Sequence, residues 1–158
     1  MGIRLRNEND YPYYATVGFS DTFVEKESSL CMDLTDEELP SGEDMNPVLA
    51  CMCGNVLQGR VDPALPFFTE KGSFWTNSTS QLLASTTQEE RQSRTRNRCN
   101  GEGFESVALI PLRLRDHTLG LLQLNDRSTG MFSPGTIQFL EGLADQIALV
   151  LSQRNATR

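Results

Sequence analysis

Apolar and polar positions are most clearly ordered in the last third of the chain. Residues 106–115, SVALIPLRLR, form a mostly apolar run that begins to alternate with polar residues at its end. Residues 119–126, LGLLQLND, form a second apolar run, and Asp116-His117-Thr118 supply a turn between the two. Two β-like runs joined by a few turn residues pair antiparallel. The pattern therefore predicts a β-hairpin over residues 106–125.

After this hairpin the apolar period changes to that of a helix. Ser133 is placed to cap the helix and Pro134 fits its first turn. The apolar side chains that follow fall into a seam with coiled-coil spacing and a second flank. We expect the flank to pack on the sheet, while the seam pairs with another subunit or leads on to the next domain. The seam comprises Ile137, Leu140, Ala144, Ile147 and Leu151, and the flank comprises Phe139, Leu143 and Val150.

The upstream pattern is weaker. Residues 1–12 are polar and charged, which predicts a flexible or truncated lead before a domain over residues 13–154, with 155–158 as a tail toward the next domain. The aromatic and β-branched residues 13–17 and 72–79 favour strands. Residues 48–52, VLACM, could be extended, and residues 54–58 suit a short helix that Gly59 ends. The acidic stretch 33–47 is typical of an exposed loop, and residues 81–98 suit an exposed helix or a long loop.

Composition narrows the class of protein. A chain of 158 residues favours one domain, and 38% hydrophobic with 22% charged residues is a globular balance. The net charge of −7 argues against nucleic-acid binding, which usually needs a basic face. No run approaches the roughly 18–20 apolar residues of a membrane span, and the first residues lack the apolar core of a signal peptide. We therefore expect a cytoplasmic domain that binds neither nucleic acid nor membrane.

The C-terminal run, residues 106–154, resembles the C-terminal half of GAF domains. It has an apolar strand ending in Pro-Leu, a turn, a Leu-Gly-Leu-Leu strand, a Phe-Ser-Pro helix start and a closing amphipathic helix. CMCGNVLQGR, FFTEKGSFWTNST and RTRNRCNGEG are similar to a subgroup of GAF domains in prokaryotic sensor histidine kinases, often beside PAS domains. The resemblance implies an α+β fold: an antiparallel sheet of about six strands, helices packed on one face and a ligand pocket on the other.

The same resemblance implies a sensory task. A GAF domain of this kind binds an unknown small molecule and passes its state through its terminal helices to adjacent PAS or kinase domains. We expect a homodimer through the C-terminal helix. The phospho-acceptor region and the Gly-rich nucleotide boxes of a kinase are absent from this chain, so we expect no catalysis by it.

Five residues are candidates for lining the ligand pocket. Phe74 and Trp75 could line it, although aromatic residues at this spacing also fill cores. Arg98 and Asn100 could contact an acidic ligand near a backbone nest, where a plain turn is the alternative. Glu102 could serve acid–base work or lie on the rim. His117, in contrast, lies in the expected hairpin turn and should face solvent.

Four cysteines, with no export signal, are more consistent with thiols or ligands than with disulfides. Thiolates suit zinc or an iron–sulfur cluster, but paired C-x-C with two distant singles is a weak signal. The two paired side chains would share one face only if their segment is extended, and in a helix they would diverge. Plain buried thiols are the alternative. The residues are Cys31, Cys51, Cys53 and Cys99.

Two rival functions remain open. One is a GAF-fold thiol enzyme of the free methionine sulfoxide reductase type, whose cysteines serve as nucleophile and resolver, although the cysteines here are arranged differently. The other is a dimerisation module with no ligand. Turnover of methionine sulfoxide would distinguish the first, and the oligomeric state would distinguish the second.

Overall fold

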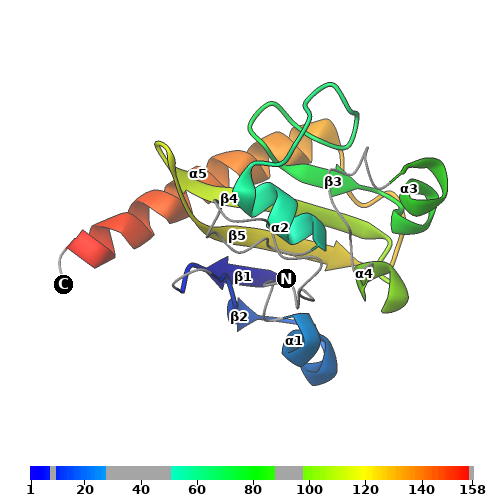
Figure 1. Cartoon of the computed structure of the whole chain (residues 1–158), viewed down its shortest axis with the longest axis horizontal. Helices are drawn as coiled ribbons and strands as arrows, with labels where there is room; N and C mark the ends of the chain where they lie inside the picture. The colour runs from blue at the N-terminus through cyan, green and yellow to red at the C-terminus, as the bar shows by residue number, and fades with distance from the viewer. Residues whose placement is uncertain (8–9, 28–50, 88–97, 157–158) are drawn as a thin grey trace, which may run out of the picture.

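The computed structural model describes residues 1–7, 10–27, 51–87 and 98–156. Its centre is an antiparallel sheet with the strand order β2-β1-β5-β4-β3 (Figure 1). This confirms the predicted α+β architecture, with five strands in the described residues where about six were expected. The strands are β1 (Gly2–Leu5), β2 (Tyr13–Thr16), β3 (Phe74–Thr76), β4 (Ser106–Leu114) and β5 (His117–Asp126). The helices are α1 (Asp21–Glu27), α2 (Cys51–Gln58), α3 (Thr79–Ser85), α4 (Arg98–Gly101) and α5 (Pro134–Ala156).

The predicted hairpin is present as β4 and β5. Their pairing runs from Ser106 opposite Asp126 to Leu114 opposite His117. The turn is tighter than predicted, because only Arg115 and Asp116 lie between the strands, and Arg115 has a φ of 56°. His117 is exposed, as expected, but it begins β5 and is not part of the turn. Local alternation was therefore sufficient to locate the two strands.

The first residues form a central strand and not a frayed lead. β1 lies between β2 and β5, with Gly2 opposite Gln123 and Leu5 opposite Gly120. A Cβ added to Gly120 would lie 2.0 Å from the Arg4 carbonyl oxygen, so only glycine lets the two backbones run this close. The prediction for residues 1–12 was wrong because the charged side chain of Arg4 is buried, and the strand that pairs with it lies more than a hundred residues later.

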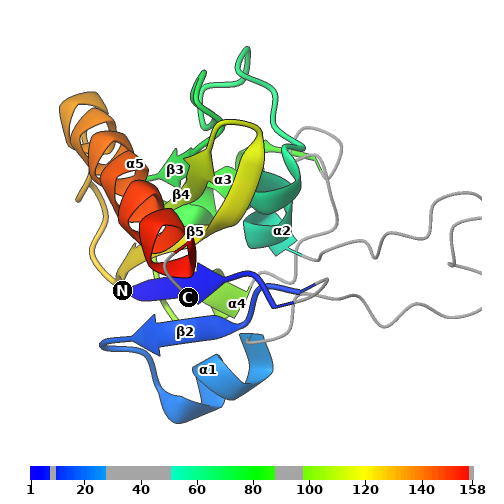
Figure 2. The ribbon, with the colours of Figure 1, turned by 90° about the vertical axis from the view of Figure 1, so that its left-hand side faces the viewer.

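Helices pack on both sides of the sheet (Figure 2). α5 covers one side, where its predicted seam residues are the ones in contact with the sheet. The expected arrangement was thus reversed: the seam serves the domain's own core, and the flank residues Phe139, Leu143 and Val150 are exposed. The strands offer their apolar face to α5, and the richer apolar stripe of the helix buries against it. This core comprises Ala108, Ile110, Leu112, Leu122, Ile137, Leu140, Ala144 and Ala148, with Ile147 and Leu151 packed against it.

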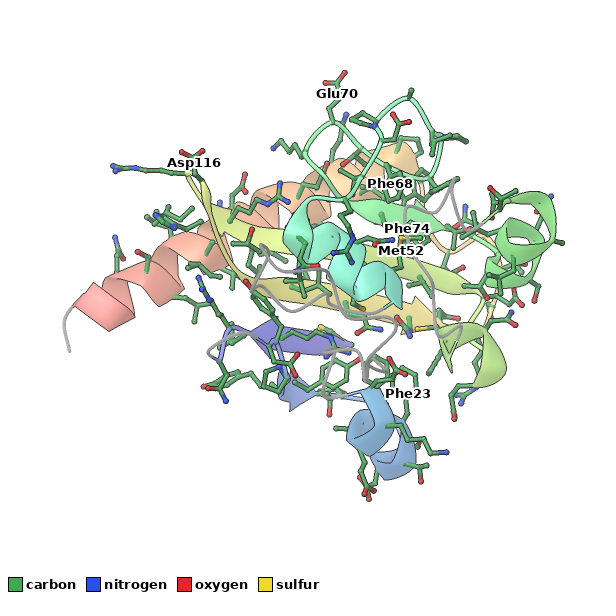
Figure 3. The ribbon with its side chains drawn as sticks, viewed as in Figure 1. Phe23, Met52, Phe68, Glu70, Phe74 and Asp116 are labelled. Atoms are coloured by element: carbon green, nitrogen blue, oxygen red, sulfur yellow. The ribbon has the colours of Figure 1, made fainter. Side chains whose placement is uncertain are left out.

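The second core lies on the α2 side and is rich in aromatic residues. Phe68, Phe74 and Met52 lie together in front of the sheet, whereas Glu70 and Asp116 extend from loop tips (Figure 3). Phe67, Phe68 and Phe74 contact each other with ring centroids 4.8–6.0 Å apart. Further members are Tyr11, Phe23, Cys53, Val56, Leu57, Phe104, Val107, Leu109 and Leu121.

Helix ends follow the signals read from the sequence. The Thr136 amide donates to Ser133 Oγ over 3.2 Å, which confirms the cap of α5. Gly59, with a φ of +72°, ends α2 as predicted, and Arg60 N donates to the Asn55 carbonyl over 2.8 Å. Cys51 and Met52 belong to α2, so the extended alternative is wrong for these two residues.

Candidate functional site

A buried arginine organises the sheet face that carries α2. Arg4 has no exposed surface, and its Nη1 and Nη2 donate to the carbonyls of Tyr11 over 3.0 Å and of Glu27 over 2.7 Å. Its guanidinium carbon lies 3.9 Å from the centre of the Tyr13 ring. Glu27 is the last residue of α1, where the helix dipole favours a cation. Arg4 therefore joins β1, the start of β2 and the end of α1.

Polar side chains continue from Tyr13 across β5. Tyr13 Oη donates to Gln123 Oε1 over 2.6 Å, and Gln123 Nε2 donates to Asn125 Oδ1 over 3.2 Å. Asn125 Nδ2 donates to Cys99 Sγ over 3.4 Å, and Gln123 Nε2 also lies 3.7 Å from that sulfur. Positions 123 and 125 share this face because strand side chains alternate. We call these four residues the polar row.

The phenol of Tyr13 remains protonated under ordinary conditions. Burial raises the pKa of Tyr13 far above its usual value, because an ionised phenolate would lose its hydration. The Arg4 charge acts in the opposite direction, while Cys53, Cys99 and Glu27 add to the rise. The hydroxyl therefore acts as a hydrogen-bond donor to the glutamine.

The cysteines are only partly brought together. Cys53 is buried on α2 and Cys99 is half-buried on α4, and both belong to the same apolar core. Cys51 and Cys53 both belong to α2, so the extended segment on which a shared face for the two thiols depended is not the one observed. Cys31 lies outside the described residues. In the described part of the chain no three His, Cys, Asp or Glu residues gather as metal ligands, and the four-cysteine site stays a prediction.

The two aromatic candidates point to opposite sides of the sheet. Phe74 is buried in the α2-side core, and Trp75 packs against the α5-side core. Neighbouring residues of one strand diverge in this way, so the pair cannot line one pocket. Trp75 is half-buried and borders two surface clefts of about 450 and 470 Å³, one beside α3 and one beside α5.

The remaining pocket candidates lie around α4. Asn100 Nδ2 donates to Thr79 Oγ1 over 3.0 Å and to Ser80 Oγ over 2.8 Å, which ties α4 to α3. Glu102 is exposed. The Gly103 amide donates to the Asn100 carbonyl over 2.9 Å, as in the plain-turn alternative. Arg98 begins α4, but its side chain lies outside the described part.

The carboxylate of Glu105 holds the start of α3. It accepts hydrogen bonds from Ser78 Oγ over 2.9 Å, from the Ser80 amide over 3.2 Å and from Ser80 Oγ. The hydrogen bond from the Ser80 side chain is the main cause that lowers the pKa of Glu105. A negative charge at a helix N-terminus is stabilised by the exposed amides. Glu105 is therefore a structural anchor here.

Sequence reasoning missed Arg4, Tyr13, Gln123 and Asn125. One signal was available: in LGLLQLND the residues Leu121, Gln123 and Asn125 share a face, so one side of a largely buried strand becomes polar toward its end. Gln123 is only 1% exposed, which turns this polar end into an internal feature. No comparable local signal identifies Arg4.

Comparison with known proteins identifies the family. The family model of the GAF domain matches residues 58–153, which is more than half of the chain. The chain belongs to the GAF family. The match includes β3, β4, β5 and most of α5, the elements on which the resemblance was based.

The sequence match of this GAF domain to an individual relative covers only a short segment. It is 41% identical over 56 residues to the DNA-binding transcriptional activator HyfR of Escherichia coli K12, a match to 35% of this chain and 8% of HyfR. The chain thus matches a small part of that relative's length.

Two solved structures share the fold. One is the GAF domain region of a protein assigned as a membrane protein from Geobacter sulfurreducens PCA, with a TM-score of 0.57, 19% identity, and coverage of 96% of this chain and 79% of the other. The other is a domain assigned to a two-component sensor histidine kinase from Sinorhizobium meliloti 1021, with a TM-score of 0.56, 14% identity, and coverage of 99% and 80%. GAF domains are in general non-catalytic sensory modules of signalling proteins. Among the described helices, none is long and apolar enough to cross a membrane.

Proposed function

We propose that this GAF domain is the sensory module of a signal-transduction protein and binds a small molecule against the polar row. The observation that supports this most directly is Gln123, an amide with 1% exposure in the middle of a core strand. Burying an amide costs free energy unless every polar atom is paired. Both ends of the Gln123 amide are paired, with Tyr13 and with Asn125, so the amide is a fixed part of a polar row beside an aromatic core, and such a row suits recognition of a polar ligand.

The chemistry of the row indicates what it would bind. It presents a phenol, two carboxamides and a thiol above an aromatic core, which suits a small polar molecule with both donors and acceptors. A metal or redox centre is the second form of the same proposal. It is supported by Cys99, whose sulfur accepts from Asn125 and lies within reach of Gln123.

The binding signal would pass to the next domain through α5. Its exposed apolar residues Phe139, Leu143 and Val150 are 70%, 39% and 55% exposed and lie at spacings of four and seven residues. Such a stripe suits a homodimer that forms through parallel C-terminal helices. Phe139→Asp should convert a dimer to a monomer in light scattering, while the neighbouring exposed Gln138→Asp should not. A monomeric wild type would remove this part of the proposal.

The host protein can be one of two kinds. The Sinorhizobium relative supports a two-component sensor histidine kinase, in which PAS or kinase domains adjoin the GAF domain. HyfR supports a transcriptional activator instead. We favour the kinase because the sequence stretches around α2 and α4 resemble that subgroup. The domains encoded beside this one in the full-length gene distinguish the two hosts.

A ligand screen tests the binding proposal. Thermal unfolding of the wild type and of Gln123→Leu would be followed against a panel of small polar metabolites, with elemental analysis and a UV–visible spectrum of anaerobically purified protein. We expect at least one compound, or bound zinc or iron, to stabilise the wild type and not Gln123→Leu. The matched control is Gln81→Leu, an exposed position on α3. If no ligand distinguishes Gln123→Leu from the control, the domain is better described as a dimerisation module.

A further inference from the structure

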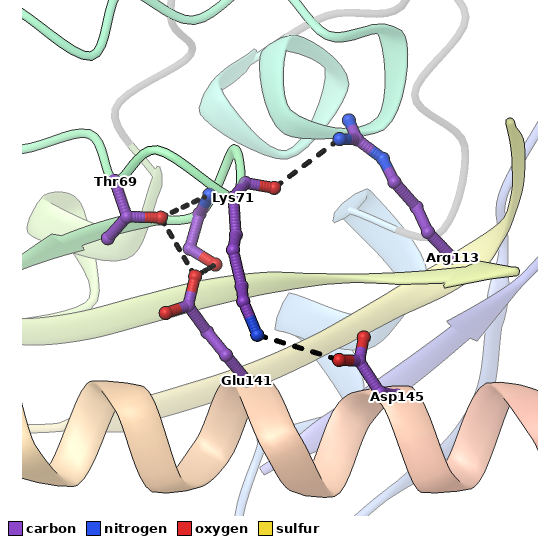
Figure 4. A network of polar contacts seen from close by, with 6 residues as sticks. Thr69, Lys71, Arg113, Glu141 and Asp145 are labelled. Atoms are coloured by element: carbon purple, nitrogen blue, oxygen red, sulfur yellow. Dashed lines mark hydrogen bonds and ion pairs between the residues drawn. The ribbon is translucent and has the colours of Figure 1, made fainter. Parts of the chain in front are cut away.

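A buried carboxylate joins α5 to a loop that belongs to the other side of the sheet. Glu141 is 6% exposed, and its Oε2 accepts from Thr69 Oγ1 and from Ser73 Oγ, each over 2.8 Å (Figure 4). The loop itself is closed by hydrogen bonds from the Ser73 amide to Thr69 Oγ1 over 3.0 Å and from the Thr69 amide to the Ser73 carbonyl over 2.9 Å. Both donors therefore move together if the loop moves.

The same loop is connected to α2. Arg113 on β4 donates through Nη2 to the carbonyl of Val56 in α2 over 3.2 Å. Its Nη1 donates to the carbonyl of Lys71 over 3.4 Å, as Figure 4 shows. Immediately before the loop, Phe67 and Phe68 are buried in the α2-side core. A displacement of α2 thus reaches Thr69 and Ser73 through one arginine and through the aromatic core.

Charge makes this contact sensitive to loop position. The cation nearest in the chain to the two hydroxyls, Lys71, pairs instead with Asp145 over 3.6 Å, and both of those side chains are 61% exposed. Within the described residues, the hydrogen-bond donors to the Glu141 carboxylate are the two hydroxyls of this loop. A buried charge is costly when it loses its donors. If the loop shifts, Glu141 loses both donors at once, and α5 must adjust.

We propose that Thr69, Ser73 and Glu141 form a loop–helix latch that transmits displacement of α2 to the position and order of α5. The proposal rests on the proposed sensory function for its source of signal, but the coupling itself needs no ligand. It assigns Glu141 a positioning role: its carboxylate holds α5 against the loop through Thr69 and Ser73.

Amide hydrogen exchange in a double-mutant cycle tests the latch on the full 158-residue chain. Leu57→Ala perturbs α2, because Leu57 is 4% exposed in the α2-side core. Glu141→Gln weakens the latch with little change in shape. Exchange of residues 137–151 is compared with that of the β4–β5 hairpin in each variant, so that a loss of global stability, which affects both, is subtracted. The matched control is Asp145→Asn, one turn further along α5, which removes the exposed ion pair instead.

We expect Leu57→Ala to accelerate α5 exchange by roughly tenfold in the wild-type background and in Asp145→Asn, and by less than about twofold when Glu141→Gln is present. Thr69→Val with Ser73→Ala should uncouple α5 in the same way, and it provides the test if Glu141→Gln does not fold. Equal acceleration in all backgrounds, or no acceleration of α5 in the wild type, would overturn the latch. Either result can be obtained whether or not a ligand is ever found, so it is separate from the ligand screen.

Discussion

Replacing Arg4 with methionine removes the guanidinium that joins β1 to α1 and β2. Two charge-assisted hydrogen bonds are lost, at about 1.5–3 kcal/mol each, together with a buried cation–π contact of about 2 kcal/mol. Methionine recovers part of this by burying a flexible apolar chain of similar length. We therefore expect Arg4→Met to lower the free energy of unfolding by about 3–5 kcal/mol, a large share of the roughly 5–15 kcal/mol typical of a domain.

Urea denaturation followed by circular dichroism measures this change. With a denaturant slope of about 2 kcal/mol per molar, the midpoint should fall by about 2 M. Arg6→Met is the matched control, because Arg6 is exposed just beyond the end of the same strand, and its effect should stay within about 0.5 kcal/mol. A midpoint for Arg4→Met close to that of Arg6→Met would refute the reasoning that this buried cation holds the N-terminal strand.

Three further outcomes follow from the same structure. Gly120→Ala should destabilise the domain by at least about 3 kcal/mol or prevent folding, because its Cβ would lie 2.0 Å from the Arg4 carbonyl oxygen. The urea midpoint measures this change. Gly142→Ala, which has open space around its Cβ, should not lower the midpoint. Burial raises the pKa of Tyr13 above its ordinary 10.0, so the unfolded chain releases this proton first as the pH rises. The contribution of Tyr13 to the free energy of unfolding is therefore complete below about pH 10 and is lost above it. Between about pH 9 and 11, Tyr13→Phe should lose less stability than the wild type. Ser80→Ala should raise the pKa of Glu105, which carbon-detected NMR titration can follow, and an unchanged pKa would contradict the hydrogen-bond assignment.

The parts of the fold that could be predicted are those set by local signals. The β4–β5 hairpin and α5 each carry their own pattern: alternation in one, and a cap with helical spacing in the other. The seam of α5 was located correctly, but it was predicted to contact another subunit or the next domain and in fact contacts the sheet. Two apolar stripes on one helix do not say which of them the sheet covers, because that depends on the angle at which the helix lies on β4.

Most of the candidate site could not be predicted from the sequence, because burial of its residues depends on distant parts of the chain. Gln123 and Asn125 look like ordinary polar ends of a strand until their face is known to be covered. Arg4 looks solvated in a charged segment, and its burial depends on Tyr11, Tyr13 and Glu27 in other elements. Phe74 and Trp75 were recognised as important, yet strand alternation already implied that they could not face one ligand together.

The position of β1 also has a consequence for the order in which the protein folds. Its central place in the sheet requires β5, which is synthesised about 115 residues later. Closing such a long loop costs more entropy than forming a hairpin. The contiguous β4–β5 pair should therefore form first, and β1 should pair with β5 afterwards. On the ribosome, β1 therefore lacks its second neighbour until β5 has emerged, and the pairing of these two strands belongs to the last steps that complete the sheet.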